Sequence, residues 1–189
     1  MPTIGVAVAI PEPWATELQD YRTAVGDVTA AMIPTHITLV PPTEVSDGLD
    51  VVEEHLALAA AKVAPFEVHL RGTGTFRPVS PVVFVTVAEG ISQCEQLAAA
   101  LRRGPLDVDL NFPYHPHVTV AHHLDDSRLD QAFDELAGFE CAFAVAQFYL
   151  YVHDEEHGWR PTRDFALASA DPAAADLAAA DLAPDAPAG

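Results

Sequence analysis

The sequence predicts an α+β fold built from two similar halves. Stretches typical of strands and of helices alternate through residues 3–169, and half of the 189 residues are apolar, which is enough for a sizeable core. One four-residue pattern (histidine, apolar, threonine, apolar) starts at His36 and again at His117, one copy in each half. Each half is expected to run strand, helix, motif strand, helix, and then one or two more strands.

In the first half, apolar residues recur at helical spacing between Trp14 and Val25, and short apolar runs flank that stretch. Pro41 and Pro42 are expected to end the first motif strand, and the glycines at 72 and 74 to interrupt the chain after the next one. The expected elements are therefore a strand over residues 3–10, a helix over 12–25, a strand over 36–40, a helix over 49–64 and a strand over 66–70.

In the second half, Gly104 and Pro105 are expected to stop a helix, and Asp125 to cap the start of the next. Pro113 and Pro116 bracket the entry to the second motif strand. The expected elements are strands over residues 82–87 and 117–121, helices over 91–103 and 125–136, two strands over 142–146 and 148–152 that pair with each other, and a last strand over 165–167.

Domain organisation follows from the same patterns. Residues 1–169 are expected to form one bilobal domain, with lobes of roughly 1–80 and 81–169 between which elements are free to swap. Residues 170–189 contain ten Ala, four Asp and three Pro, a low-complexity composition that cannot build a core. We expect this segment to be a tail outside the fold.

The excess of acidic over basic residues limits the kinds of ligand and partner that the chain is expected to bind. The net charge is −19 and Lys62 is the single lysine, so the chain lacks the basic stripe that long duplex nucleic acid requires. We expect a small cyclic phosphate or a short RNA end as ligand. The two cysteines are too few for a disulfide framework, and neither a basic leader nor a membrane-spanning stretch is evident. We therefore expect a cytoplasmic protein. We also expect it to be a monomer.

The two motifs suggest one site. Residues two apart in a strand point to the same face, so His36 and Thr38 should share a face, as should His117 and Thr119. Two imidazoles near their usual pKa of about 6.5 can act as acid and base, while threonine hydroxyls can donate hydrogen bonds to phosphate oxygens. The four side chains are the expected catalytic set.

With these motifs the chain resembles the two-histidine phosphoesterase superfamily, which includes the bacterial 2′-5′ RNA ligase-like proteins. Both tetrapeptides, His36-Ile37-Thr38-Leu39 and His117-Val118-Thr119-Val120, match the family signature in full. The resemblance implies an antiparallel sheet in each lobe, a cleft between the lobes, and hydrolysis of cyclic or 2′-5′ phosphodiesters without metal or other cofactor. It also implies a reversible ligation. For hydrolysis, the resemblance implies that His36 acts as the acid and His117 as the base.

Other residues are weaker candidates for substrate binding. Phe76 could stack on a base and Arg77 could neutralise the phosphate, while Tyr149 and Tyr151 share a strand face that could line the cleft. A terminal phosphate could also be reached by two basic residues near the last strand, Arg160 and Arg163. His115 is interpreted as an orienting or structural residue.

Two alternatives stay open. One is a zinc hydrolase, because His115, His117, His122 and His123 are close in sequence, although this leaves the first motif and Thr119 unexplained. The other is a nucleotide-binding module without turnover, for which a lost histidine or threonine would be the sign, and none is lost. Activity that survives a chelator would count against the first, and tight binding without turnover would favour the second.

Overall fold

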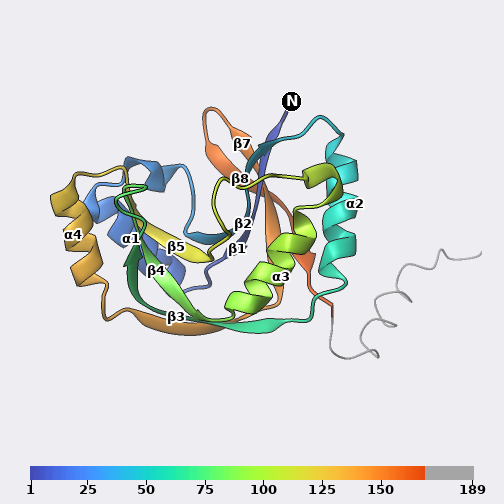
Figure 1. Ribbon diagram of the computed structural model, residues 1–189. Coiled ribbons are helices and arrows are strands. Elements are labelled where there is room, and N and C mark those ends of the chain that lie inside the picture. Colours follow the sequence, from blue (N-terminus) through green and yellow to red (C-terminus); the bar gives the residue numbers. More distant parts are fainter. Residues whose placement is uncertain (169–189) are drawn as a thin grey trace, which may run out of the picture.

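The computed structural model describes residues 1–168, so the alanine-rich segment 170–189 lies outside the described residues. These 168 residues form a curled antiparallel sheet with helices packed on it (Figure 1). The strands are β1 (Thr3–Ala9), β2 (His36–Glu44), β3 (Phe66–Thr75), β4 (Val82–Glu89), β5 (His117–His122), β6 (Glu140–Val145), β7 (Gln147–Asp154) and β8 (Gly158–Ala166). The helices are α1 (Trp14–Val25), α2 (Leu49–Ala60), α3 (Ile91–Leu101) and α4 (Asp126–Glu135), with short 3-10 turns at Val28–Ala31 and Gly104–Leu106.

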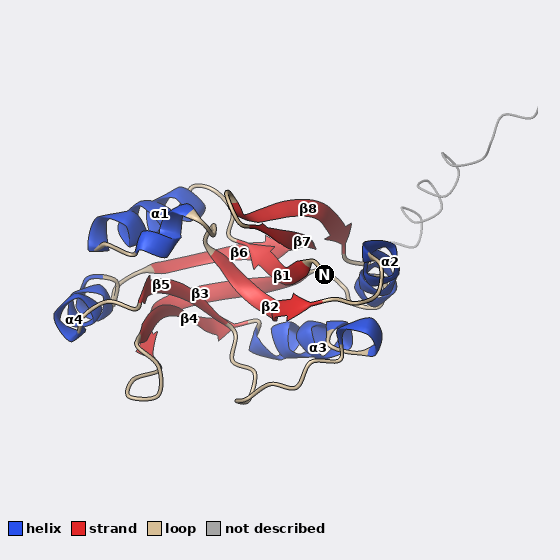
Figure 2. Cartoon of the chain, turned by 90° about the horizontal axis from the view of Figure 1, so that it is seen from above, coloured by secondary structure: helices blue, strands red, loops and turns tan. Residues whose placement is uncertain are grey.

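The strand order is β6-β3-β4-β5-β2-β1-β7-β8. This sheet consists of two four-stranded halves, because β5 and β2 join through a single registered pair, Ile37 with Val118. Helices α1 and α4 pack near the half that contains β3, β4 and β5, whereas α2 and α3 contact each other, β8 and β2 (Figure 2). The predicted α+β architecture with an antiparallel sheet in each half is confirmed.

The core lies on one face of the two motif strands. Their burial alternates in the same way, so that Ile37, Leu39, Val118 and Val120 are fully buried while the histidines and threonines are half-buried. The strict alternation holds because a strand sends successive side chains to opposite faces. Each motif strand therefore anchors its aliphatic residues in the core and presents its polar ones on the other side.

Strand β2 does not end at the two prolines, contrary to the sequence prediction. It runs on to Glu44, with Thr43 paired to Ile4 of β1. Within residues 1–168, Val118 opposite Ile37 is the one registered partner of β2 on its other side, so no described strand pairs with that edge where the chain reaches Pro41 and Pro42. A proline is tolerated where no ladder bond is required of its missing N–H.

Strand β3 also continues beyond its expected end at residue 70. Gly72 has φ +69° at an irregularity in the pairing with β4, a conformation that glycine adopts without steric cost. Gly74 is needed for a steric reason, because a Cβ there would lie 2.6 Å from the ring of Phe84 on β4. The glycines shape the strand for close packing and do not break it.

The expected pairing of the strands over 142–146 and 148–152 is wrong. Strand β6 pairs with β3 at one edge of the sheet, whereas β7 pairs with β1 and β8 in the other half. One residue, Ala146, separates β6 from β7, and the tightest common hairpin needs a two-residue loop. The chain therefore passes straight from one half of the sheet to the other.

The remaining elements are close to the prediction, with two changes in length. Helix α2 stops at Ala60, and β8 begins at Gly158, well before the expected residue 165. Asp125 caps α4 as expected, since its carboxylate accepts a hydrogen bond of 3.1 Å from the backbone N–H of Arg128. Among the helices of residues 1–168, none has the length and apolar character needed to cross a membrane.

Candidate active site

The contact between β2 and β5 brings the two motifs side by side. Ile37 and Val118 are the central residues of the two motifs and are paired across antiparallel strands. In this register Thr38 stands opposite His117, and His36 opposite Thr119, with all four side chains on the face away from the core. Diagonal neighbours across such strands are about 7–8 Å apart, which leaves room for a phosphate between the two imidazoles.

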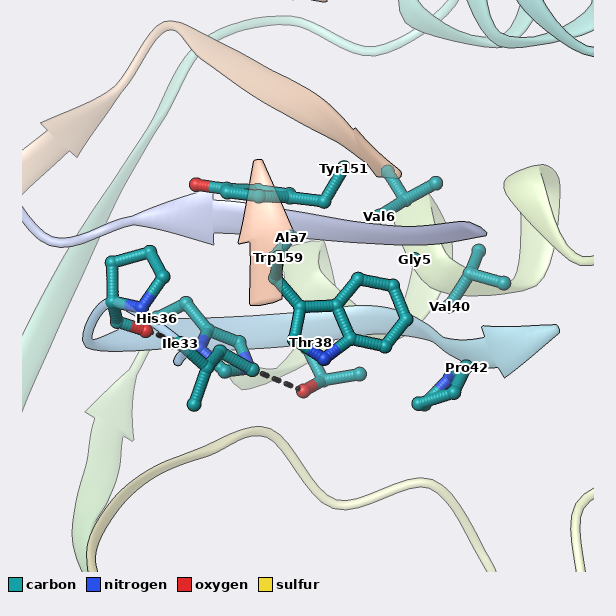
Figure 3. Close-up of a pocket in the computed structure, with 11 residues that line it drawn as sticks. Gly5, Val6, Ala7, Ile33, His36, Thr38, Val40, Pro42, Tyr151 and Trp159 are labelled. Atoms are coloured by element: carbon teal, nitrogen blue, oxygen red, sulfur yellow. Dashed lines mark hydrogen bonds between the residues drawn. The ribbon is translucent and has the colours of Figure 1, made fainter. Parts of the chain in front are cut away.

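Both imidazoles are held in the same way. Nδ1 of His36 lies 2.7 Å from the carbonyl oxygen of Pro34, and Nδ1 of His117 lies 2.7 Å from the carbonyl oxygen of His115. A carbonyl can only accept, so each Nδ1 carries the proton and donates it. Nε2 is therefore left as the reactive nitrogen of each ring, and that of His36 lies 3.1 Å from Oγ1 of Thr38 (Figure 3).

All four motif side chains line one cleft of about 760 Å³. This volume lies in the range of about 300–1,000 Å³ that is usual for small-molecule sites. The walls come from both halves of the sheet and from the loops before β4 and β5; they include Arg22, Phe76, Ser80, Phe112, Tyr114, His115, His122 and Trp159.

A model of the 2′-5′ RNA ligase superfamily matches residues 10–157, which is most of the chain and includes both motifs. The chain belongs to this superfamily. The superfamily is the two-histidine phosphoesterase group that the paired tetrapeptides indicate, so the resemblance seen in the sequence is confirmed.

Curated relatives agree with this membership, and solved structures share the fold. A provisionally named phosphoesterase of Oceanobacillus iheyensis is 28% identical over 144 residues, covering 75% of this chain and 84% of its own. A second, from Staphylococcus epidermidis, is 26% identical and covers 87% of this chain and 98% of its own. The fold is shared with TT0787 of Thermus thermophilus (TM-score 0.65, 22% identity, 89% and 100% coverage) and with E. coli LigT without ligand (0.61, 23%, 88% and 98%).

Burial sets the protonation of the site. It lowers the pKa of His36 to about 4, and the nearby positive charge of Arg22 and the ring of His117 act in the same direction. Burial also lowers the pKa of His117, assisted by the neighbouring His115. The hydrogen bonds to the two carbonyls oppose these effects in part. Without a ligand, both imidazoles are therefore neutral at pH 7.

An aromatic cluster supports the second motif. The ring of Phe76 stands edge-on to His117 at 4.9 Å between centroids, and Phe84 lies 5.1 Å from the same imidazole. Phe76 and Phe84 are themselves 4.5 Å apart. Phe76 thus lines the cleft, as its candidate role requires, and it also fixes the position of the His117 ring.

Four other candidates lie apart from the cleft. Arg77 is turned towards α4, where its guanidinium forms ion pairs with Asp130 at 2.8 Å and Asp126 at 3.4 Å. Tyr149 is hydrogen-bonded to Gln147 and is not part of the cleft wall. Arg163 is bound to Glu53 of α2. Arg160 is exposed, and it too is absent from the cleft wall.

Tyr151 lies closer to the first motif. It lines a small pocket together with His36, Thr38 and Trp159, and that pocket opens beside β1 (Figure 3). Trp159 lines both this pocket and the main cleft. Its ring packs on Gly5, where a Cβ would lie 3.2 Å away, and its backbone N–H donates to the carbonyl of Met32 at 2.8 Å.

Several cleft residues were not among the candidates from the sequence, and Arg22, Tyr114 and Trp159 illustrate why. Arg22 had a detectable signal, since it follows Leu18 by four positions and so shares the buried face of α1. Tyr114, whose hydroxyl donates to the carbonyl of Thr38 at 2.8 Å, stands in a loop without periodicity. Trp159 is the second residue of β8, a strand that was expected to start only at residue 165, so its strand register was not available.

The histidines considered as zinc ligands do not gather at one point. The tilted rings of His122 and His123 are 3.8 Å apart between centroids, and His115 is 6.3 Å from His117 by the same measure. Within residues 1–168, no group of three or more His, Cys, Asp or Glu side chains is arranged to hold a metal ion. The geometry therefore gives no support to the metallohydrolase alternative.

Proposed function

We propose that this superfamily member is a phosphodiesterase that opens a 2′,3′-cyclic phosphate through its two motif histidines, without a metal ion. The observation that carries the proposal is the Ile37–Val118 pair, because it relates the two motifs by a local twofold axis, and both motif histidines line one cleft. E. coli LigT, which has the same fold, has been solved with 3′-AMP and with ATP, and such ligands are of the size that this cleft accommodates.

The reaction needs one base and one acid. His117 removes a proton from a water molecule, whose oxygen forms a bond to phosphorus. The bond between phosphorus and either the 2′ or the 3′ oxygen breaks, and His36 gives its proton to that oxygen. The product is a phosphate monoester beside a free hydroxyl. In a ligation, the 5′ hydroxyl of a second strand would take the place of the water, so that its oxygen forms the bond to phosphorus while the same ring bond breaks.

The substrate itself supplies the conditions for this step. His36 must be protonated to act as acid, although burial keeps it neutral in the free protein. A bound phosphodiester carries a negative charge, which favours the imidazolium and raises the pKa of His36. Thr38 and Thr119 donate hydrogen bonds to the non-bridging oxygens, where negative charge grows in the transition state.

The test is hydrolysis of a panel of 2′,3′-cyclic nucleotides and cyclic-phosphate oligonucleotides in the presence of excess chelator. We expect turnover that the chelator does not reduce. Loss of activity with chelator and its return with added zinc would overturn the metal-free mechanism. Tight binding of the panel with no turnover under any condition would instead identify a nucleotide-binding module.

A further inference from the structure

The cleft has little positive charge to offer a ligand. Among the described residues that line it, Arg22 is the one arginine, and the single lysine of the chain, Lys62, is not part of the wall. Arg22 is itself engaged: Nε and Nη2 donate to Asp27 at 3.2 and 3.1 Å, and Nη1 donates to the carbonyl of Ile33 at 3.0 Å. Its charge is compensated before any phosphate arrives.

Three arginines elsewhere on the described surface are also paired, whereas Arg71, Arg103 and Arg160 are exposed and do not line the cleft. Arg77 is bound by Asp126 and Asp130, and Arg163 by Glu53. Arg128 contacts Asp125 and also donates to the carbonyl of Val25. None of these side chains lines the cleft. A phosphate next to the one being cleaved would therefore find Arg22 as the one permanent cation of the described wall, and that charge is already paired with Asp27.

Exposed carboxylates lie in two loops that also contribute residues to the cleft wall. Asp107 and Asp109 are exposed in the loop that contributes Leu110 and Phe112 to the wall. Glu155 and Glu156 are exposed at the tip of the hairpin that leads into Trp159. Within about one Debye length, roughly 10 Å at 0.1 M salt, such groups repel additional phosphates.

The rim of the cleft is apolar instead. Val79 is 70% exposed and Phe112 is 65% exposed, although both line the cleft, and Trp159 provides a further ring. Exposed apolar groups around a polar centre are typical of a ligand site. They suit the flat face of a nucleobase attached to the reacting phosphate.

On this ground, and resting on the function proposed above, we infer that the substrate carries a single phosphate: a mononucleoside 2′,3′-cyclic phosphate, and not the end of a longer RNA. The phosphate is neutralised by the two motif imidazoles and their threonines. The base lies against the apolar rim. Each further phosphate of an oligonucleotide would meet carboxylates with no unpaired arginine or lysine of the described wall to offset them.

The first test compares kcat/KM for adenosine 2′,3′-cyclic phosphate with that for a tetra-adenylate that ends in the same group, from about 0.02 to 0.5 M salt. We expect the mononucleotide to be favoured by about tenfold or more at low salt. The rate with the tetra-adenylate should rise as salt screens the repulsion, while the mononucleotide changes little. An equal or higher kcat/KM for the tetra-adenylate at low salt, falling as salt is added, would overturn the inference.

A double charge-reversal variant tests whether the carboxylates of one loop cause the selectivity against the tetra-adenylate. Asp107→Lys combined with Asp109→Lys should raise kcat/KM for the tetra-adenylate several-fold and leave that for the mononucleotide unchanged. The control combines Glu67→Lys with Asp134→Lys, two exposed residues that do not line the cleft, and it changes the net charge by the same amount. Equal effects of the two double variants would show that the loop carboxylates do not select the substrate.

A binding measurement separates this inference from the proposed function. Calorimetric titration of the same protein with adenosine 3′-monophosphate and with a 3′-phosphorylated tetra-adenylate requires no turnover. Tighter binding of the monophosphate at low salt would uphold the single-phosphate selectivity even if no substrate were hydrolysed, in which case the catalytic proposal alone would fail. Tighter binding of the tetra-adenylate would refute the selectivity, whatever the activity.

Discussion

At the scale of single residues, the site depends on which nitrogen of each imidazole is free. The carbonyls of Pro34 and His115 fix Nδ1 of the two motif histidines, and this detail was not accessible from the sequence. Strand parity alone was enough to predict that His36 and Thr38 share one face and that His117 and Thr119 share another. What parity could not supply is the burial that lowers the histidine pKa values, because burial depends on the packing of distant segments.

The lowered pKa values predict an acid-shifted pH profile. In the free protein His36 has a pKa of about 4, and kcat/KM reports the free protein. As pH rises above that value the acid loses its proton, so kcat/KM should be maximal below pH 6.5 and fall towards neutral pH. Initial rates at low substrate from pH 4 to 8 measure this profile, and an optimum above pH 7 would contradict it.

The same shift predicts proton uptake on binding. A phosphate that raises the pKa of His36 from about 4 must draw a proton from solution near pH 6. Calorimetric titrations with adenosine 3′-monophosphate in two buffers of different ionisation enthalpy should therefore give different apparent enthalpies. His36→Gln removes the titrating group, so the buffer dependence should shrink in that variant; an unchanged dependence would assign the proton to another group.

At the scale of elements, Arg22 ties α1 to the chain segment that enters β2. Both side chains of its ion pair with Asp27 are buried. The Asp27 carboxylate also accepts hydrogen bonds from the backbone N–H and the hydroxyl of Thr29. Breaking a buried pair by removing one charge costs about 3–5 kcal/mol. We expect Asp27→Asn to lower the free energy of unfolding by an amount of this order in urea denaturation. The control Asp20→Asn, at an exposed position of α1, should change it little.

A second prediction at this scale concerns the strand that supports His117. A Cβ at Gly74 would lie 2.6 Å from the Phe84 ring, which in turn packs against the imidazole. Gly74→Ala should cost about 1–3 kcal/mol of stability by overpacking and should lower kcat by displacing His117. Gly138→Ala is the matched control, because a Cβ there has no neighbour within 4 Å. Similar denaturation midpoints and rates for both variants would rule out this packing role.

Elements were predicted from the sequence better than their pairing was. The helices and the motif strands follow from periodicity, but β6 and β7 were expected to pair because they are adjacent in sequence. The decisive feature, a single residue between them, becomes informative only when the two-residue minimum of a hairpin is applied. The extension of β2 through Pro41 could not be foreseen, since it depends on which strands flank it in space.

At the scale of the whole molecule, the net charge of −19 is the dominant property. Like charges at this density repel one another and destabilise the compact state, and salt screens that repulsion. The melting temperature should therefore rise by several degrees between about 0.02 and 0.5 M sodium chloride. Differential scanning calorimetry measures it, and a melting temperature that falls with salt would show that attractive ion pairs outweigh the repulsion.

The twofold relation of the motifs is also a property of the whole molecule. The half-chain spacing of His36 and His117 predicted equivalent positions, and the Ile37–Val118 pair provides them. The sequence could not show that the halves of the sheet exchange strands: β3 joins β4, β5 and β6, whereas β7 and β8 join β1 and β2. Only the long-range pairing determines this exchange.

The central claim is that His36 and His117 act together on one phosphate. The most direct measurement is kcat/KM on adenosine 2′,3′-cyclic phosphate, with chelator present, for the wild type, His36→Ala, His117→Ala and the double variant, each checked for an unchanged circular dichroism spectrum. We expect each single variant to lose about 10²–10⁴-fold, and the double variant to lose little more than either single one, because the two groups act as a unit. Near wild-type turnover in either single variant would contradict the paired-histidine mechanism.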